Sequence, residues 1–158
     1  MPKARNIIIH CSDTPNGRGD DAEDIRRWHT DPKPKGNGWN APGYHFVIPV
    51  SGERQSLVPI DDDEFVEPWE IANGARGHNH NSIHICLIGR DRFTREQWDS
   101  LGWLVGKLNA QFPAASACGH CDLDPVNKPH CPGFDVQAWL KDPAAVEAAH
   151  LLNLGGAA

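Results

Sequence analysis

The chain has 158 residues, of which 39% are hydrophobic and six are tryptophan, so it is long enough to bury a core of its own. No apolar run approaches the roughly 18 residues of a membrane-spanning helix, so we expect no stable association with a membrane. The net charge is −6 and the lysines and arginines are scattered, which leaves no basic stripe for a nucleic-acid partner. We therefore expect a globular domain that acts as a monomer and binds no nucleic acid.

The first residues, "MPKARNIIIHCSD", begin with basic side chains but contain only three consecutive isoleucines before polar residues return. This run is too short for the apolar region of a signal peptide, so we expect the chain to be made and initially kept in a cytoplasm. Its five cysteines are an odd number. Without a secretion signal, such cysteines favour reduced thiols or metal ligands over a disulfide framework.

The first half of the chain alternates apolar runs with polar loops. The β-branched run "RNIIIHCS" predicts a buried strand at 5–12, and "DDAEDIRRWHT" predicts a helix at 20–30 that begins at an aspartate N-cap. Residues 31–43 are rich in proline and glycine and predict a loop. "YHFVIPVSG" (44–52) and "ERQSLVPI" (53–60) then predict the two strands of a hairpin.

The second half contains the longest predicted helix. Residues 61–81 are predicted as a loop with one helical turn, and the near-continuous apolar run at 82–89 predicts a strand covered on both faces. Residues 94–112 predict a helix, because a Thr–Gln capping box precedes apolar residues that share one helical face. A short strand at 115–120 and a short helix at 134–142 follow.

These segments predict an α/β fold in which a central mixed sheet is flanked by helices. We find no internal repeat and expect one domain over 1–158, with a core at about 5–142 and a C-terminal tail at 143–158 that adds a helical turn or two.

The stretch "ACGHCDLDPVNKPHCPGFD", residues 117–135, holds three of the five cysteines and two of the nine histidines. Cys118 and Cys121 have the spacing of a redox dithiol, but a thioredoxin-like site opens a long helix, which the following prolines prevent. With His130 and Cys131 they also offer four ligands for a local zinc knuckle. Adjacent side chains diverge, so His130 and Cys131 suit a knuckle poorly.

A third interpretation joins this stretch to the first strand. His10 lies at the end of the strand predicted at 5–12, and His120 follows the short strand predicted at 115–120. Two histidines at the ends of neighbouring strands, together with a thiolate from the next loop, can hold zinc and leave a fourth position open for water, which is the catalytic arrangement. Spacing alone leaves all three interpretations open.

Five motifs along the chain carry a family resemblance. In order they are "IIIHCSDT", "IRRWH", "GYHFVI", "GHNHNSIHICLIG" and "GHCDLDPVNKPHCPGFDV", and together they cover residues 5–140. With these motifs the chain resembles the zinc-dependent N-acetylmuramoyl-L-alanine amidases, which include phage lysozyme-type amidases and peptidoglycan recognition proteins. The resemblance implies a mixed sheet flanked by helices, with a zinc cleft on one face.

By position, the resemblance implies that His10, His120 and Cys131 are the ligands of one Zn²⁺ per chain. It also implies that Tyr44 and Lys128 are catalytic: the tyrosine beside the metal donates a hydrogen bond to a reacting oxygen, and the lysine offsets developing negative charge. Lys128 lies three residues before Cys131, where two is the commoner spacing in the family. We further expect Trp39, His78 and Asn81 to contact the substrate.

The resemblance implies a peptidoglycan hydrolase that cleaves the amide between N-acetylmuramic acid and L-alanine. A phage or prophage endolysin without a wall-binding module fits the chain best. It would be made in the host cytoplasm and would reach the periplasmic wall after the membrane is permeabilised. One alternative is a non-catalytic peptidoglycan-binding protein of the same fold, but such proteins usually lack the thiolate ligand that Cys131 provides. A dithiol oxidoreductase that uses "CGHC" is the other alternative.

Overall fold

The fold is built on one five-stranded sheet, which the computed structural model of the chain describes within residues 1–154. The strand order is β3-β2-β4-β1-β5, and every neighbouring pair is parallel except β2 and β3. The strands are β1 (Asn6–Cys11), β2 (Phe46–Ile48), β3 (Gln55–Ser56), β4 (Ser82–Leu87) and β5 (Ser116–Gly119). The predicted α/β fold with a mixed sheet is confirmed.

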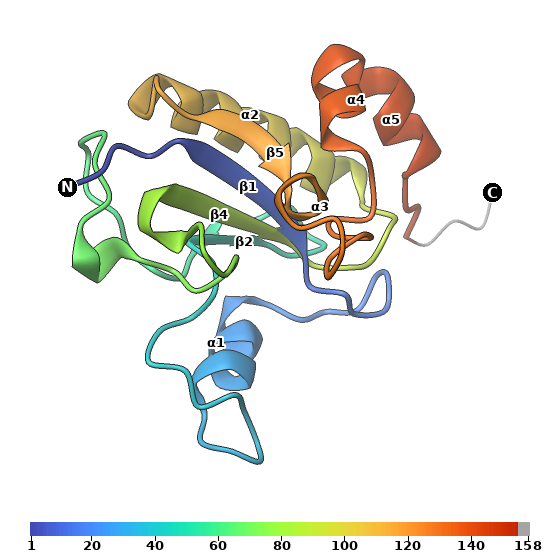
Figure 1. The fold of residues 1–158 in the computed structure, drawn as a ribbon. Helices are drawn as coiled ribbons and strands as arrows, with labels where there is room; N and C mark the ends of the chain where they lie inside the picture. Colours follow the sequence, from blue (N-terminus) through green and yellow to red (C-terminus); the bar gives the residue numbers. More distant parts are fainter. Residues whose placement is uncertain (155–158) are drawn as a thin grey trace.

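Helices cover both faces of this sheet (Figure 1). The long helix α2 lies along one face with two helices from the end of the chain beside it, and α1 lies on the opposite side. No helix within residues 1–154 has both the length and the apolar character needed to cross a bilayer. The helices are α1 (Ala22–Thr30), α2 (Arg95–Gln111), α3 (His120–Leu123), α4 (Val136–Lys141) and α5 (Pro143–Ala149), and two 3₁₀ turns lie at Pro68–Glu70 and Asn79–Asn81.

All five predicted strands are shorter in the structure, above all the two of the hairpin, of which the first, predicted over 44–52, contains only Phe46–Ile48. The second hairpin strand contains only Gln55 and Ser56, although the N–H groups of the next two residues still donate to carbonyls near β2. Proline at 59 has no N–H with which to continue the ladder. The last strand ends at Gly119, so that His120 begins α3. The helical part of the tail is α5, and residues 155–158 lie outside the described part of the chain.

The two faces of the sheet differ in character. The face under α2 is a continuous apolar cluster to which alternate residues of β1 and β4 contribute, among them Ile7, Ile9, Ile83 and Ile85. The opposite face carries two smaller clusters, one under α1 and one beside α3. Buried histidines on that second face line up between the two clusters: His10, His45 and His84. The apolar core therefore supports the sheet from one side, and polar side chains occupy the centre of the other.

The start of α2 is tied to the sheet by Thr94 and Gln97. The Thr94 side chain accepts from the Gln97 backbone N–H, and the Gln97 side-chain oxygen accepts from the Thr94 N–H at 2.9 Å. The buried amide of Gln97 also donates to the carbonyl oxygens of Ile48 (3.1 Å) and Ile88 (2.9 Å). One side chain thus caps the helix and satisfies backbone groups at the ends of β2 and β4.

We predict that Gln97→Leu lowers the free energy of unfolding by about 2–4 kcal/mol, because it leaves buried backbone groups without partners. The measurement is urea denaturation followed by circular dichroism. Asn109→Leu makes the same amide-to-leucine change on the exposed side of α2 and should shift stability by less than about 0.5 kcal/mol. Equal losses in the two variants would contradict the account.

Candidate metal centre

Parallel pairing brings two histidines together at one edge of the sheet. Ile9 of β1 lies opposite Gly119 of β5, so the next residues, His10 and His120, leave neighbouring strand ends side by side. Their ring centroids are 4.7 Å apart, and both side chains are buried. The carboxyl ends of parallel strands are where such folds commonly place their binding sites.

Cys131 reaches this pair from the loop after α3. Its carbonyl oxygen accepts from the Cys121 N–H at 2.9 Å, which ties the loop to the helix that His120 begins. Gly119 leaves room for the loop, since a Cβ there would lie 3.0 Å from Cδ of Pro132. Gly133 has φ +96°, and a Cβ there would overlap the Arg90 carbonyl oxygen. These close approaches bring the Cys131 Sγ to 3.8 Å from Nδ1 of His10.

His10, His120 and Cys131 form a group that could hold a metal ion, with their ligand atoms all within 4.8 Å of one another. Tetrahedral zinc with two imidazoles and one thiolate places ligand atoms about 3.3–3.7 Å apart, close to the observed Sγ–Nδ1 separation. The arrangement therefore fits zinc after small side-chain adjustments.

The electrostatics of the group agree with a bound cation. Burial, followed by the nearby His120, lowers the pKa of His10 well below its usual range, so its ring is neutral and has a lone pair to offer. A hydrogen bond with Cys11 and burial raise the pKa of the Cys131 thiol. A metal ion supplies the positive charge that a thiolate needs at this position.

Neither local interpretation of the dense stretch is supported. Burial raises the pKa of the Cys118 thiol to about 12, the opposite of what a reactive dithiol requires. Within residues 1–154, no group with metal-ligand geometry contains Cys118, Cys121 or His130. Cys131 thus groups with His10 of β1 and with His120, and not with the other two cysteines of its own segment.

A second group of side chains within residues 1–154 lies close enough together to bind a metal ion. It is acidic and consists of Asp61, Asp63 and Glu70. The two carboxylate oxygens of Glu70 accept from the backbone N–H groups of Asp61 (2.8 Å) and Glu67 (2.9 Å). Asp63 likewise accepts from the Phe65 N–H. These carboxylates hold a turn together.

A cleft of about 1240 Å³ opens over the His10–His120–Cys131 group. Its wall includes a row of aromatic rings, in which successive centroids are 4.7–5.3 Å apart: Trp39, His29, Tyr44 and His10. A second hollow, of about 750 Å³, lies against α2 and shares no residue with this cleft. The candidate metal group therefore lies at the floor of a large opening with an aromatic side.

The structure places both predicted catalytic residues in this cleft. The Tyr44 ring lies 4.9 Å from the His10 ring, and burial, with a further contribution from Cys86, raises the pKa of its hydroxyl well above the usual range. Tyr44 is therefore a hydrogen-bond donor at neutral pH. Lys128 is exposed on the cleft wall. Burial is the main cause that lowers the pKa of His120, and the positive charge of Lys128 is the second.

Of the three predicted substrate contacts, only Trp39 lines the cleft. Trp39 is half-exposed on the cleft wall, with its ring tilted against that of His29. His78 and Asn81 lie at the turn before β4 and do not line the cleft. The backbone carbonyl oxygen of Asn81 accepts from the Arg5 N–H at 2.7 Å. A substrate role for His78 and Asn81 stays a prediction.

Two further histidines at the site are not among those that the sequence singled out. His29 lines the cleft, and its Nδ1 accepts from the Gly43 N–H at 2.9 Å. His84, in the middle of β4, is hydrogen-bonded to His10 at 2.9 Å. The alternation in "SIHICLIG" puts His84 on one face of its strand, but the partner strand and register that bring it to His10 cannot be read from that segment.

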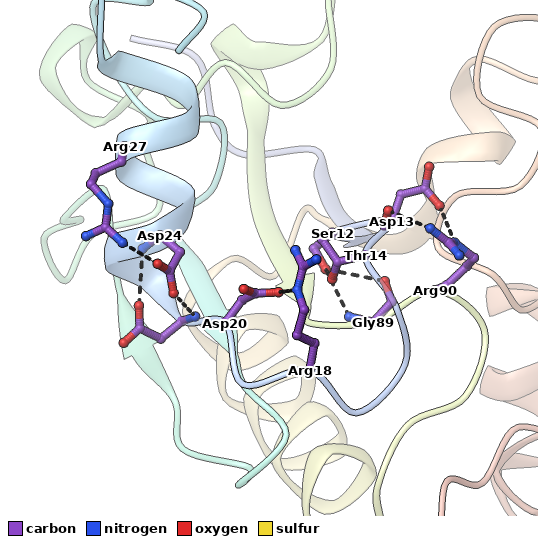
Figure 2. A network of polar contacts seen from close by, with 10 residues as sticks. Ser12, Asp13, Thr14, Arg18, Asp20, Asp24, Arg27, Gly89 and Arg90 are labelled. Atoms are coloured by element: carbon purple, nitrogen blue, oxygen red, sulfur yellow. Dashed lines mark hydrogen bonds and ion pairs between the residues drawn. The ribbon is translucent and has the colours of Figure 1, made fainter. Parts of the chain in front are cut away.

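The rim of the cleft is tied by contacts between the ends of β1 and β4 (Figure 2). The Gly89 N–H donates to the Ser12 hydroxyl at 2.9 Å, and Arg90 pairs with the Asp13 carboxylate at 2.9 Å. Asp13 itself has φ +55°, a left-handed conformation that aspartate tolerates better than most residues. These contacts fix the turn that immediately follows the ligand candidate His10.

Comparison with known proteins supports the family resemblance. Residues 1–134 match the family described as N-acetylmuramoyl-L-alanine amidase. An endolysin of Enterobacteria phage T3 is 33% identical over 84% of this chain and 83% of its own length.

Two solved structures share the fold. The N-acetylmuramoyl-L-alanine amidase LysC from Clostridium intestinale superposes with a TM-score of 0.68 at 22% identity, over 89% of this chain and 85% of that one. Drosophila PGRP-LB superposes with a TM-score of 0.67 at 23% identity, over 90% and 82%. With its family match, its endolysin relative and this fold, the chain belongs to the N-acetylmuramoyl-L-alanine amidase family.

Proposed function

We propose that this amidase is zinc-dependent and acts as an endolysin on the bond between N-acetylmuramic acid and L-alanine in peptidoglycan. The observation that carries the proposal is the His10–His120–Cys131 group, with its ligand atoms within 4.8 Å at the floor of an open cleft. Three protein ligands with access from solvent are the mark of a catalytic zinc site, whereas structural sites are closed by four. The relatives named endolysins support the biological role.

A bound zinc ion would activate water near neutral pH and polarise the scissile carbonyl. The remaining chemistry belongs to the chain. Tyr44, protonated at neutral pH, donates a hydrogen bond to the reacting oxygen as negative charge develops on it. The Lys128 ammonium, on the exposed wall of the same cleft, offsets that charge. Trp39 offers an aromatic surface at the entrance for a sugar or peptide group.

The proposal includes the route to the substrate. We place the chain in the host cytoplasm on synthesis and its action at the periplasmic wall, reached once the membrane has been permeabilised. We also propose that it acts as a monomer, because one chain supplies all three ligand candidates and both catalytic side chains.

Metal removal tests the proposal first. The purified protein should contain about one zinc per chain, and a strong chelator should abolish turbidity loss of permeabilised Gram-negative cells, with Zn²⁺ restoring it. Cys131→Ser should weaken zinc binding by more than about 100-fold, since even partners outside the ligand set are worth 10–100-fold. Cys121→Ser, the same change at another half-buried cysteine, should bind normally. Full activity of the metal-stripped protein would refute zinc dependence.

The products identify the bond. Purified peptidoglycan digested by this protein should gain L-alanine amino termini, measured by dinitrophenylation and chromatography. No new reducing sugar ends should appear, because an amidase leaves the glycosidic bonds that paired carboxylates cleave in glycosidases. New reducing ends without new amino termini would contradict the assignment.

Tyr44→Phe removes one hydroxyl and nothing else from the aromatic row. Turnover should fall about 100-fold, the scale of losing one transition-state donor, while zinc content and unfolding midpoint stay near those of the unmodified protein. Lys128→Ala should lower turnover less, because its ammonium is exposed and screened. Unchanged turnover in both variants would leave the metal as the only catalyst.

A further inference from the structure

A row of buried imidazoles stands behind His10. His10 Nε2 is hydrogen-bonded to His84 Nδ1 at 2.9 Å, and the His84 ring is stacked on that of His45, with centroids 5.6 Å apart and planes 11° from parallel. All three side chains have at most 1% of their surface exposed. Burying imidazole rings is unfavourable unless their polar atoms are hydrogen-bonded. The hydrogen bonds of this row therefore indicate which ring nitrogens carry a proton.

The outer end of the row has a fixed proton arrangement. The backbone N–H of His84 donates to His45 Nδ1 at 2.9 Å, so that nitrogen is an acceptor. The proton of a neutral His45 is therefore on Nε2, which lies 2.6 Å from the Glu70 carbonyl oxygen and donates to it. His45 thus anchors the backbone of His84 to a second, distant segment.

The inner end depends on what His10 does. His10 Nδ1 faces Cys131, and a nitrogen that binds a metal must offer its lone pair. The proton of His10 is then on Nε2 and must be donated, and the atom at 2.9 Å that can accept it is His84 Nδ1. The opposite arrangement, with His84 as donor, would put the His10 proton on Nδ1, where it blocks binding.

The other ring nitrogen of His84 is buried without a partner in the described part of the chain. If His84 accepts through Nδ1, its own proton is on Nε2, and this is the buried side-chain nitrogen that has no hydrogen-bond partner within residues 1–154. A residue that served only the core would not need an imidazole there. His84 thus leaves one buried N–H unpaired while presenting an acceptor to His10.

The His84 ring has little freedom to turn away. His45 stacks on one side, and on another side a Cβ added to Gly74 would lie 2.6 Å from His84 Nδ1. Strand β4 fixes the backbone position of His84. His84 pairs with Ile8 in the β1–β4 ladder, and the next residue on that face of β1 is His10.

We infer that His84 is a positioning residue, which accepts the Nε2 proton of His10 and so holds the His10 ring with its Nδ1 lone pair towards the metal. The inference rests on the proposed zinc function and adds a partner that selects the tautomer of one ligand. Metal-bound histidines are usually oriented by a carboxylate, a carbonyl or water, and here a second imidazole takes that place.

The test compares two similar replacements of His84. His84→Asn keeps an acceptor close to the position of Nδ1, and His84→Leu keeps apolar bulk without one. Zinc affinity is measured by competition with a chromogenic chelator on folded protein, and ¹⁵N NMR of the histidine rings in the zinc-loaded native protein reports each tautomer. Ile85→Val, on the opposite face of the same strand, is the control for loss of packing in β4.

We expect His84→Leu to bind zinc about 10–100-fold more weakly than the native protein, and His84→Asn and Ile85→Val to stay within about threefold. In the zinc-loaded native protein, His10 and His84 should both carry their protons on Nε2. Native affinity in His84→Leu, equal weakening in His84→Asn, or a proton on His10 Nδ1 would each overturn the inference. The NMR result decides even if a variant fails to fold, and a native protein that binds no zinc would refute the proposed function instead.

Discussion

The parallel pairing of β1 with β4 on one side and β5 on the other is the constraint on which the site depends. It aligns Ile9 with Gly119, so that His10 and His120 leave adjacent strands at the same edge, and it aligns Ile8 with His84. Side chains alternate along a strand, so a slip of one residue in β1 would turn His10 to the face under α2. The apolar cluster on that face, which Ile7 and Ile9 join, prevents the slip. Apolar packing on one face of the sheet thus determines which side chains lie on the other face, at the candidate site.

The second face of the sheet buries polar side chains, and these belong to the candidate site. Its two small apolar clusters leave a central strip of histidines whose buried polar atoms are paired with one another, with Cys131 or with backbone, apart from one nitrogen of His84. Glycines at 74, 119 and 133 allow other segments to approach this strip closely. Close packing carries Cys131 to His10, while the cleft above these ligand candidates stays open to solvent.

Much of this could be predicted from the sequence, and what could not has a physical cause. The strand at 5–12 and the long helix were predicted because apolar periodicity and the Thr94–Gln97 capping box are local signals. The group of His10, His120 and Cys131 was expected only through the order of motifs, since spacing cannot show which strands are neighbours. The contact between His84 and His10 depends on strand order and register together, and "SIHICLIG" gives no sign of either. Both hairpin strands were predicted too long because the prediction ran through Pro49 and Pro59, neither of which has an N–H with which to continue a ladder.

X-ray absorption at the zinc edge of the loaded protein tests the central claim most directly, because it counts the sulfur ligands of the ion. A site split between β1, β5 and the Cys131 loop predicts one sulfur at about 2.3 Å, with two imidazole nitrogens among the lighter ligands at about 2.0–2.1 Å. Two or more sulfur ligands would show that a cysteine other than Cys131 also binds the ion. That result would contradict the account, in which Cys131 is the one sulfur ligand of the ion.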